Sequence, residues 1–125
     1  VDTYGSENGP YRLIDYDLLP GQDDDQRCVA RVEVSDNLVT VDGEGSGPIE
    51  AFVNAMVETL NEPLTVLGYQ ENALGTGSDA QAICILAIDD PETEMRCYGL
   101  GVSRNTITAS LNAIVSALNR RWAKG

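Results

Sequence analysis

The sequence GEGSGPIEAFVNAMVETLN at residues 43–61 runs from a cluster of glycines into a helix-like pattern. Gly47 is a candidate N-cap, Pro48 suits the first helical position, and Glu50 follows three residues after the cap. Apolar residues then recur at helical spacing and form a wide stripe along one face. We therefore expect a helix that begins at Pro48, ends by Pro63 and covers a sheet.

A second copy of this pattern lies 58 residues further along the chain. The sequence ITASLNAIVSALN at 107–119 carries the same residue as 49–61 at seven of thirteen positions. Each copy also follows a glycine-x-glycine step, Gly43–Gly45 in the first case and Gly99–Gly101 in the second. The repeat indicates a duplicated unit.

Extended segments precede each helix pattern. Residues 28–34 alternate between apolar and partly polar positions, as expected of a half-buried strand, and turn residues separate this segment from its neighbours. The predicted strands are about Tyr11–Leu19, Cys28–Val34, Leu38–Val41, Leu64–Gln70, Ala82–Ile88 and Met95–Leu100. A second helix is predicted over Thr106–Trp122. The chain therefore has the element order βββα twice.

The length of 125 residues suits one compact domain. A unit of about 60 residues can barely bury a core alone. The predicted fold class is therefore α+β, with two pseudo-symmetric βββα units that share one core and form a dimer, because a second copy can cover the remaining apolar surface. We interpret residues 1–10 as a terminal tail or linker and 11–125 as one domain, with halves of about 11–62 and 63–122.

The composition excludes several functions. Twenty acidic residues against eight basic ones leave a net charge of −12, so we expect neither nucleic acid nor an anionic membrane as a partner. Histidine is absent, which removes Ser-His and Cys-His nucleophiles and every His-containing metal site. Asp23–Asp25 lacks EF-hand spacing and is interpreted as a solvated loop. We expect no catalysis by this chain alone.

The cysteines and the apolar segments bear on the cellular compartment. Cys28, Cys84 and Cys97 are widely spaced and form no CxxC pair, so we expect reduced core thiols. No apolar stretch approaches the roughly 18 residues that a membrane span needs. Val1 is not an initiator methionine, and no signal-peptide pattern precedes the first strand. We therefore expect a soluble, cytoplasmic piece of a longer protein.

The glycine-rich loop at 43–48 lies between a strand and a helix start, where backbone N–H groups and the helix dipole can hold an anion. No lysine lies in or beside the loop, and its spacing matches neither a P-loop nor a dinucleotide-binding turn. These features argue against a phosphate. A small carboxylate ligand and a purely structural tight turn both remain open.

The second glycine-bearing stretch, Tyr69–Gln81, mixes small residues with one aromatic and one acid. An amino-acid ligand needs donors for its carboxylate, an acceptor for its ammonium group and an apolar pocket for its side chain. The helix-start amides could be the donors, and Asp79 or backbone carbonyls the acceptors. The apolar candidates are Ile49, Val66, Tyr69 and Ala73. Alternatively, Tyr69 is an ordinary core aromatic and Asp79 an ordinary turn acid.

Three motifs in register carry a family resemblance over about residues 26–122. They are GEGSGPIEAFVNAM at 43–56, YQENALGTGSDAQA at 69–82 and GLGVSRNTITASLNAIVSALNRRW at 99–122. Together they closely resemble the C-terminal regulatory domain of the α-isopropylmalate synthases, which catalyse the leucine-inhibited first step of leucine biosynthesis. The related citramalate synthases share this domain but usually respond to isoleucine.

The resemblance implies an amino-acid-binding regulatory domain that pairs with its twin and holds L-leucine at the domain interface of the homodimer. Carried over by motif, the effector-binding positions are Ser46, Ile49, Val66, Tyr69, Ala73, Asp79, Ala80 and Val102. The catalytic domain of the same polypeptide, a (β/α)₈ barrel, is absent from these residues. The resemblance therefore implies no catalytic residue and no cofactor here, with the divalent metal only in that barrel.

Some positions depart from the family pattern. The family often has Asn at the position of Ser46 and His at that of Asn72, so polar contacts with the ligand are expected to be weaker or rerouted. Glu50 replaces a commonly small residue, and we interpret it as a helix cap rather than an ammonium partner. Two alternatives to leucine sensing stay open: an isoleucine-sensing domain of a citramalate synthase, and a structural dimerisation module without an effector.

Overall fold

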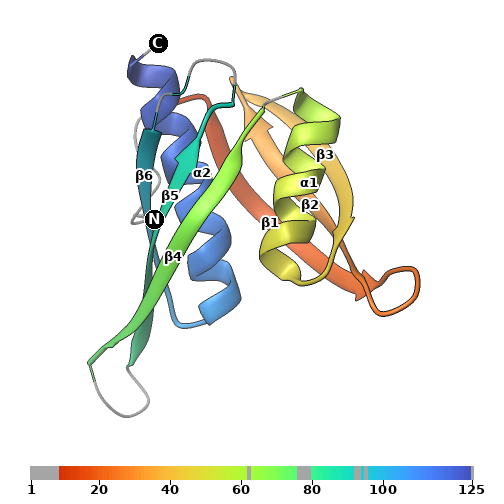
Figure 1. Cartoon of the computed structure of the whole chain (residues 1–125), viewed down its shortest axis with the longest axis horizontal. Helices are drawn as coiled ribbons and strands as arrows, with labels where there is room; N and C mark the ends of the chain where they lie inside the picture. The colour runs from red at the N-terminus through yellow and green to blue at the C-terminus, as the bar shows by residue number, and fades with distance from the viewer. Residues whose placement is uncertain (1–8, 62, 76–79, 92–93, 95, 125) are drawn as a thin grey trace.

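The computed structural model describes residues 9–61, 63–75, 80–91, 94 and 96–124. Two antiparallel three-stranded sheets, ordered β1-β2-β3 and β4-β5-β6, are each followed by a helix (Figure 1). The elements are β1 (Tyr11–Pro20), β2 (Gln26–Val34), β3 (Asn37–Gly45), α1 (Pro48–Leu60), β4 (Thr65–Leu74), β5 (Gln81–Asp89), β6 (Arg96–Ser103) and α2 (Thr106–Lys124). The predicted α+β fold with a repeated βββα unit is confirmed.

The largest differences from the predicted boundaries lie in β3 and β4. We expected β3 to end at Val41, but it continues to Gly45, so Gly43 and Gly45 belong to the strand rather than to the loop. Both glycines are buried on the side that faces α1. Their lack of side chains reflects the packing of a helix against this strand. Strand β4 likewise continues beyond Gln70 to Leu74.

The start of α1 is as predicted. Gly47 is the N-cap in an extended conformation and Pro48 occupies the first turn. The helix ends at Leu60, earlier than Pro63, because Asn61 adopts a left-handed conformation with φ of 59° and donates its N–H to the Val57 carbonyl at 3.0 Å. Asparagine tolerates this conformation better than most residues, which explains the earlier end.

Glycines let each helix approach its sheet closely. A side chain at Gly43 would lie 2.8 Å from the carbonyl oxygen of Ala51, and one at Gly101 would lie 2.6 Å from the backbone nitrogen of Ala113. The offset of 58 residues that relates the helices also relates Gly43 to Gly101 and Ala51 to Ala109. Both units therefore use the same contact between a strand glycine and helix alanines.

The two units share one core. Residues 109–119 of α2 are buried on every side, because α2 packs on β5 and β6 and also contacts β1 and α1 (Figure 1). Asn119, itself buried, joins the units: its Oδ1 accepts the Tyr11 N–H at 2.9 Å and its Nδ2 donates to the Tyr11 carbonyl at 2.8 Å. The prediction of a common core is confirmed.

All three cysteines are free thiols in this core. Cys28 pairs with Gly43 across β2 and β3, and Cys84 pairs with Gly101 across β5 and β6, so the two occupy equivalent places in their units. Burial raises the pKa of Cys28 to about 11 and raises that of Cys84. Both thiols are therefore uncharged at neutral pH. Among the described residues, no helix is long and apolar enough to cross a bilayer.

The glycine contact predicts a stability difference between two substitutions. Gly101→Ala places a methyl group against the α2 backbone, so we expect it to lower the free energy of unfolding by about 1–3 kcal/mol. Gly68→Ala is the control, because a side chain there meets nothing within 4 Å, and it should change stability by less than about 0.5 kcal/mol. Urea unfolding of both variants measures this, and equal stability of the two would contradict the packing argument.

Candidate functional site

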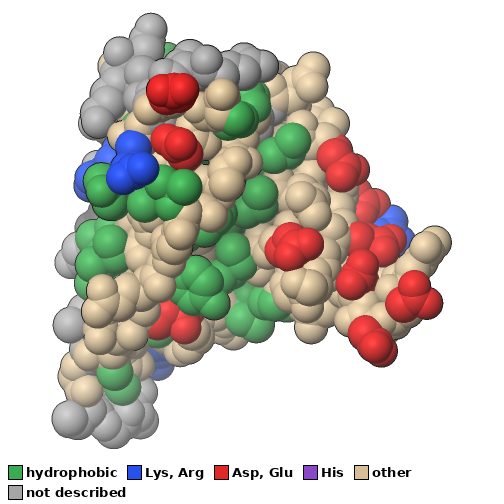
Figure 2. All heavy atoms as spheres, viewed as in Figure 1, with side chains coloured by type: hydrophobic (Ala, Val, Ile, Leu, Met, Phe, Trp, Pro, Cys, Tyr) green, Lys and Arg blue, Asp and Glu red, His purple; other side chains and the backbone are tan. Residues whose placement is uncertain are grey.

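A pocket of about 680 Å³ lies where the start of α1, strand β4 and the start of α2 converge. This volume is within the usual range for small-molecule sites. Figure 2 shows hydrophobic side chains gathered in the region between β4 and α1. The lining residues are Ser46, Gly47, Pro48, Ile49, Glu50, Val53, Leu64, Thr65, Val66, Tyr69, Glu71, Thr106, Ile107 and Ser110.

A difference between the two pseudo-symmetric units explains why this space is open. In the first unit, β1 lies against α2, and the Tyr16 hydroxyl is 2.6 Å from Thr108 Oγ1. Tyr16 pairs with Ala30 of β2, and its counterpart Tyr69 pairs with Leu86 of β5 at the same register position. Among the described residues, no hydrogen bond joins Tyr69 to α1, and the pocket lies between β4 and the start of α1.

The walls of the pocket are largely apolar. Ile49 and Val53 come from α1, Val66 and Tyr69 from β4, and Ile107 from α2. The Tyr69 side chain is 55% exposed, so the interpretation of Tyr69 as an ordinary core aromatic is wrong. Its ring is a partly open wall, and the walls together suit an aliphatic side chain.

The start of α1 offers hydrogen-bond donors to the pocket. The N-cap Gly47 makes no side-chain cap, whereas Asn105 at the start of α2 accepts from the N–H groups of Ile107 at 2.8 Å and Thr108 at 3.1 Å. Beside Gly47, the Ser46 hydroxyl donates to Glu50 Oε1 at 2.9 Å. A helix start with no side-chain acceptor at its cap favours an anionic group such as a carboxylate.

A polar pair lines the pocket near α2. The Ser110 hydroxyl lies 2.7 Å from Glu71 Oε2 and 3.1 Å from the Thr106 carbonyl oxygen, and Ser110 is only 1% exposed. In the first unit the corresponding residues are apolar. Leu18 corresponds to Glu71, because Leu18 pairs with Cys28 in the way that Glu71 pairs with Cys84. Phe52 corresponds to Ser110, because the two are separated by the 58-residue offset of the repeat.

Glu71 and Ser110 were missed in the sequence analysis. For Ser110, the sequence does carry a signal: the helix repeat has Phe52 at the matching position, so a polar residue replaces an apolar one there. Glu71 can be matched to Leu18 only once the strand register is known, because the number of residues between β4 and α2 differs from the number between β1 and α1. The carboxylate of Glu71 can accept from an ammonium group in the pocket.

The structure brings four of the eight predicted effector-binding residues together in this pocket: Ser46, Ile49, Val66 and Tyr69. Ala73 and Ala80 line an adjoining hollow of about 340 Å³, which shares Glu71 and Thr106 with the pocket.

The other two predicted positions are Asp79 and Val102. Asp79 lies outside the described residues, so its predicted role as an acceptor stays a prediction. Val102 follows Gly101, which faces α2, and pairs with Ile83. Because side chains alternate along a strand, Val102 lies on the opposite face of the β4–β6 sheet from the helix.

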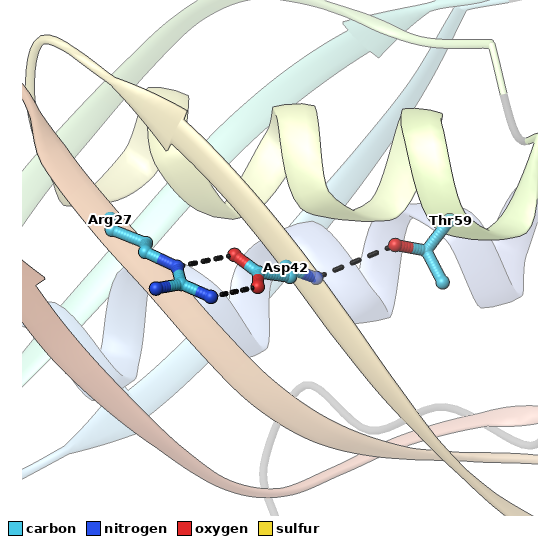
Figure 3. A network of polar contacts seen from close by, with 3 residues as sticks. All are labelled: Arg27, Asp42 and Thr59. Atoms are coloured by element: carbon cyan, nitrogen blue, oxygen red, sulfur yellow. Dashed lines mark hydrogen bonds and ion pairs between the residues drawn. The ribbon is translucent and has the colours of Figure 1, made fainter. Parts of the chain in front are cut away.

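Charged pairs elsewhere are structural. Arg27 Nε donates to Asp42 Oδ1 at 2.9 Å, and the Asp42 N–H donates to Thr59 Oγ1 at 3.4 Å (Figure 3). The hydrogen bond from Arg27 lowers the pKa of the Asp42 carboxyl group. None of these residues lines the pocket. No group of three or more side chains suited to a metal ion occurs among the described residues.

Comparisons with known proteins agree with this architecture. The chain is 36% identical over 115 residues to 2-isopropylmalate synthase of Brucella suis, covering 90% of the chain and 20% of the relative. It is 32% identical over 123 residues to that of Ralstonia nicotianae, covering 98% and 21% respectively. With the Agrobacterium fabrum enzyme the identity is 36% over 123 residues, covering 96% and 22%. The chain thus spans about a fifth of the length of these relatives.

A family model described as the LeuA allosteric (dimerisation) domain matches residues 1–122. The match covers both βββα units up to Trp122 in α2, and every residue that lines the pocket. This chain therefore belongs to the LeuA allosteric (dimerisation) domain family.

Proposed function

We propose that this chain is the regulatory part of a 2-isopropylmalate synthase and binds L-leucine as a feedback inhibitor of leucine biosynthesis. The observation that carries the proposal is the pocket at the start of α1, which combines backbone donors, carboxylates and apolar walls. Family membership and the name shared by the relatives support it.

A zwitterionic amino acid with an aliphatic side chain matches these three features. Its carboxylate would accept from the N–H groups at the start of α1, next to Ser46. Its ammonium group would donate to Glu71, which already accepts from Ser110. The branched side chain would lie between Ile49, Val66 and Tyr69. Asp79 is a further candidate acceptor, and the adjoining hollow places Ala73 and Ala80 beside this site.

The effector would act by thermodynamic linkage. The domain is expected to work as a homodimer attached to the catalytic domain of the same polypeptide, which joins acetyl-CoA to 2-oxoisovalerate and holds any divalent metal. Leucine then favours the less active arrangement of the catalytic domains to the extent that it binds this arrangement more tightly than the active one. The domain itself contributes regulation and association rather than catalysis.

Leucine is favoured over the two alternatives for specific reasons. The relatives that match are named 2-isopropylmalate synthase, which favours leucine over the isoleucine response of citramalate synthases. The donors and carboxylates that line the pocket argue against a purely structural module, since the equivalent place in the first unit is closed by the contact between Tyr16 and Thr108.

A thermal-denaturation series tests the choice of ligand. L-Leucine should raise the melting temperature progressively, because a ligand at 100 times its dissociation constant stabilises the folded state by about 2.7 kcal/mol. Isoleucine and valine should act only at higher concentration, since a misplaced or missing methylene costs about 1–3 kcal/mol. A larger shift with isoleucine would favour the citramalate synthase alternative, and no shift with any of them would favour the structural module.

Removal of the aromatic wall should abolish binding. Tyr69→Ala deletes a half-exposed ring, so the fold should persist while leucine binding falls below detection by titration calorimetry. Leu38→Ala is a matched control, because Leu38 is a 61% exposed hydrophobic residue on β3 that does not line the pocket. Unchanged leucine affinity in Tyr69→Ala would contradict the assigned site.

The ammonium contact can be tested separately. Glu71→Gln keeps the shape of the side chain but removes its charge, so the dissociation constant for leucine should rise about tenfold or more. The analogue 4-methylpentanoate lacks the amino group and should bind the variant and the original chain equally. Glu58→Gln, an exposed position of α1 outside the pocket, is the control. An equal loss for both ligands would show that Glu71 acts through structure alone.

A further inference from the structure

The charged groups that line the pocket are all of one sign. Glu50 and Glu71 are acidic, and no lysine or arginine is among the described residues that line it, while Arg104 lines only the adjoining hollow. The start of α1 supplies about half a positive charge, which does not offset two carboxylates. Since the chain also carries a net charge of −12, a ligand whose only charge is negative meets an unfavourable potential. A favourable ligand therefore brings a positive charge of its own.

The polar pair of Glu71 and Ser110 is arranged to receive such a charge. The Ser110 hydroxyl has one proton and two acceptors nearby, Glu71 Oε2 at 2.7 Å and the Thr106 carbonyl oxygen at 3.1 Å. The shorter distance and the negative charge both favour donation to Glu71. Within the described residues, Ser110 is the only hydrogen-bond partner of the Glu71 carboxylate, so Oε1 can accept from a ligand.

The first unit shows that the βββα fold does not need this pair. Leu18 and Phe52 occupy the corresponding positions, and Phe52 is completely buried in the core. The second unit instead has a carboxylate on β4 and, at 1% exposure, a serine on α2. A buried polar group lowers stability unless it is hydrogen-bonded, and even then it contributes less to the core than an apolar ring. The pair is therefore explained by recognition rather than by folding.

We infer that the pocket selects ligands by their ammonium group, and that Ser110 positions the Glu71 carboxylate for this selection. L-Leucine is accepted, whereas the 2-oxo acid with the same carbon skeleton is rejected. The inference rests on the proposed function and adds the chemical class that the site excludes. In a reaction sequence, such a site responds to the product of an amination and not to the 2-oxo acid that is aminated.

The rejection follows from the chemistry of the ligand atom that faces Glu71. The carbonyl oxygen of a 2-oxo acid accepts hydrogen bonds and donates none, so it would place an acceptor against the acceptor Oε1. The hydroxyl group of a 2-hydroxy acid donates one hydrogen bond but carries no charge, whereas an ammonium group makes a charge-assisted bond that is about twice as strong. The expected order of affinity is amino acid, 2-hydroxy acid and then 2-oxo acid.

Titration calorimetry of the original chain with three ligands tests the selection. L-Leucine has both charges, 4-methyl-2-oxopentanoate keeps only the carboxylate, and L-leucinamide keeps only the ammonium group. The dissociation constant should be about 30-fold or more higher for the 2-oxo acid than for leucine, because a charged hydrogen bond is replaced by two facing acceptors. Leucinamide should bind more tightly than the 2-oxo acid, because the pocket carries two carboxylates and no cation from the described lining residues.

The positioning role of Ser110 is tested by two serine substitutions on α2. Ser110→Ala should raise the dissociation constant for leucine about fivefold and reduce the preference for leucine over the 2-oxo acid. Ser116→Ala is the matched control, because Ser116 is also fully buried but accepts the Leu100 N–H at 3.2 Å and does not line the pocket. In a Glu71→Gln background, Ser110→Ala should have little further effect, since residues that act through one another are not additive.

Each part of the inference can fail separately. Equal affinity for leucine and for the 2-oxo acid would overturn the selection while leaving leucine binding intact, whereas absence of leucine binding would overturn the proposed function as well. An unchanged preference in Ser110→Ala, or an equal loss in Ser116→Ala, would overturn the positioning role of Ser110. Circular dichroism verifies that each variant is folded, and the three-ligand comparison on the original chain needs no variant.

Discussion

The close contact between strand glycines and helix alanines is the constraint on which the rest of this structure depends. At Gly43 and at Gly101 the helix backbone lies so near the strand that a β-carbon would not fit. This contact sets the height and direction of each helix over its sheet, and thereby the place where each helix begins. Because the pocket lies between the two helix starts and β4, its shape follows from this packing, in which Ala51 and Ala109 stand next to the lining residues Glu50 and Ser110.

Duplication supplies the fold, and departures from the duplication supply the site. Where the first unit closes β1 onto α2 through Tyr16, the second leaves Tyr69 open to the pocket. Two positions change from the first unit to the second, Leu18 to Glu71 and Phe52 to Ser110, and at the helix caps the first unit has Gly47 where the second has the capping Asn105. The unit that lines the pocket therefore has polar groups, or an uncapped helix start, where the other unit has an apolar side chain or a capping side chain. Among the described residues, only the second unit lacks the hydrogen-bonded contact between its first strand and the helix of the other unit, so the rest of the core stays closed.

Much of the fold was predictable because its signals are local or repeated. Helix starts and the 58-residue repeat appear directly in the sequence, and they indicated the βββα units. The glycine-bearing segments and the family resemblance added eight candidate site residues, of which four line the pocket. The end of β3 was not predictable, because glycine usually interrupts a strand and only the approach of α1 explains Gly43 within one. The face on which Val102 lies and the pairing of Glu71 with Ser110 depend on strand register, which no single segment of sequence determines.

The two faces of the β4–β6 sheet carry different features. Strands β4 and β5 contribute Tyr69 to the pocket on one face and the exposed Ile85 to the other. A ligand held between β4 and α1, as proposed, would draw β4 toward α1 and change the twist of this sheet. Packed interfaces respond to such changes by repacking rather than by gradual deformation. If the pocket holds the effector as proposed, its occupation is therefore coupled to the geometry of this sheet through β4 and β5, without a chain of contacts across the core.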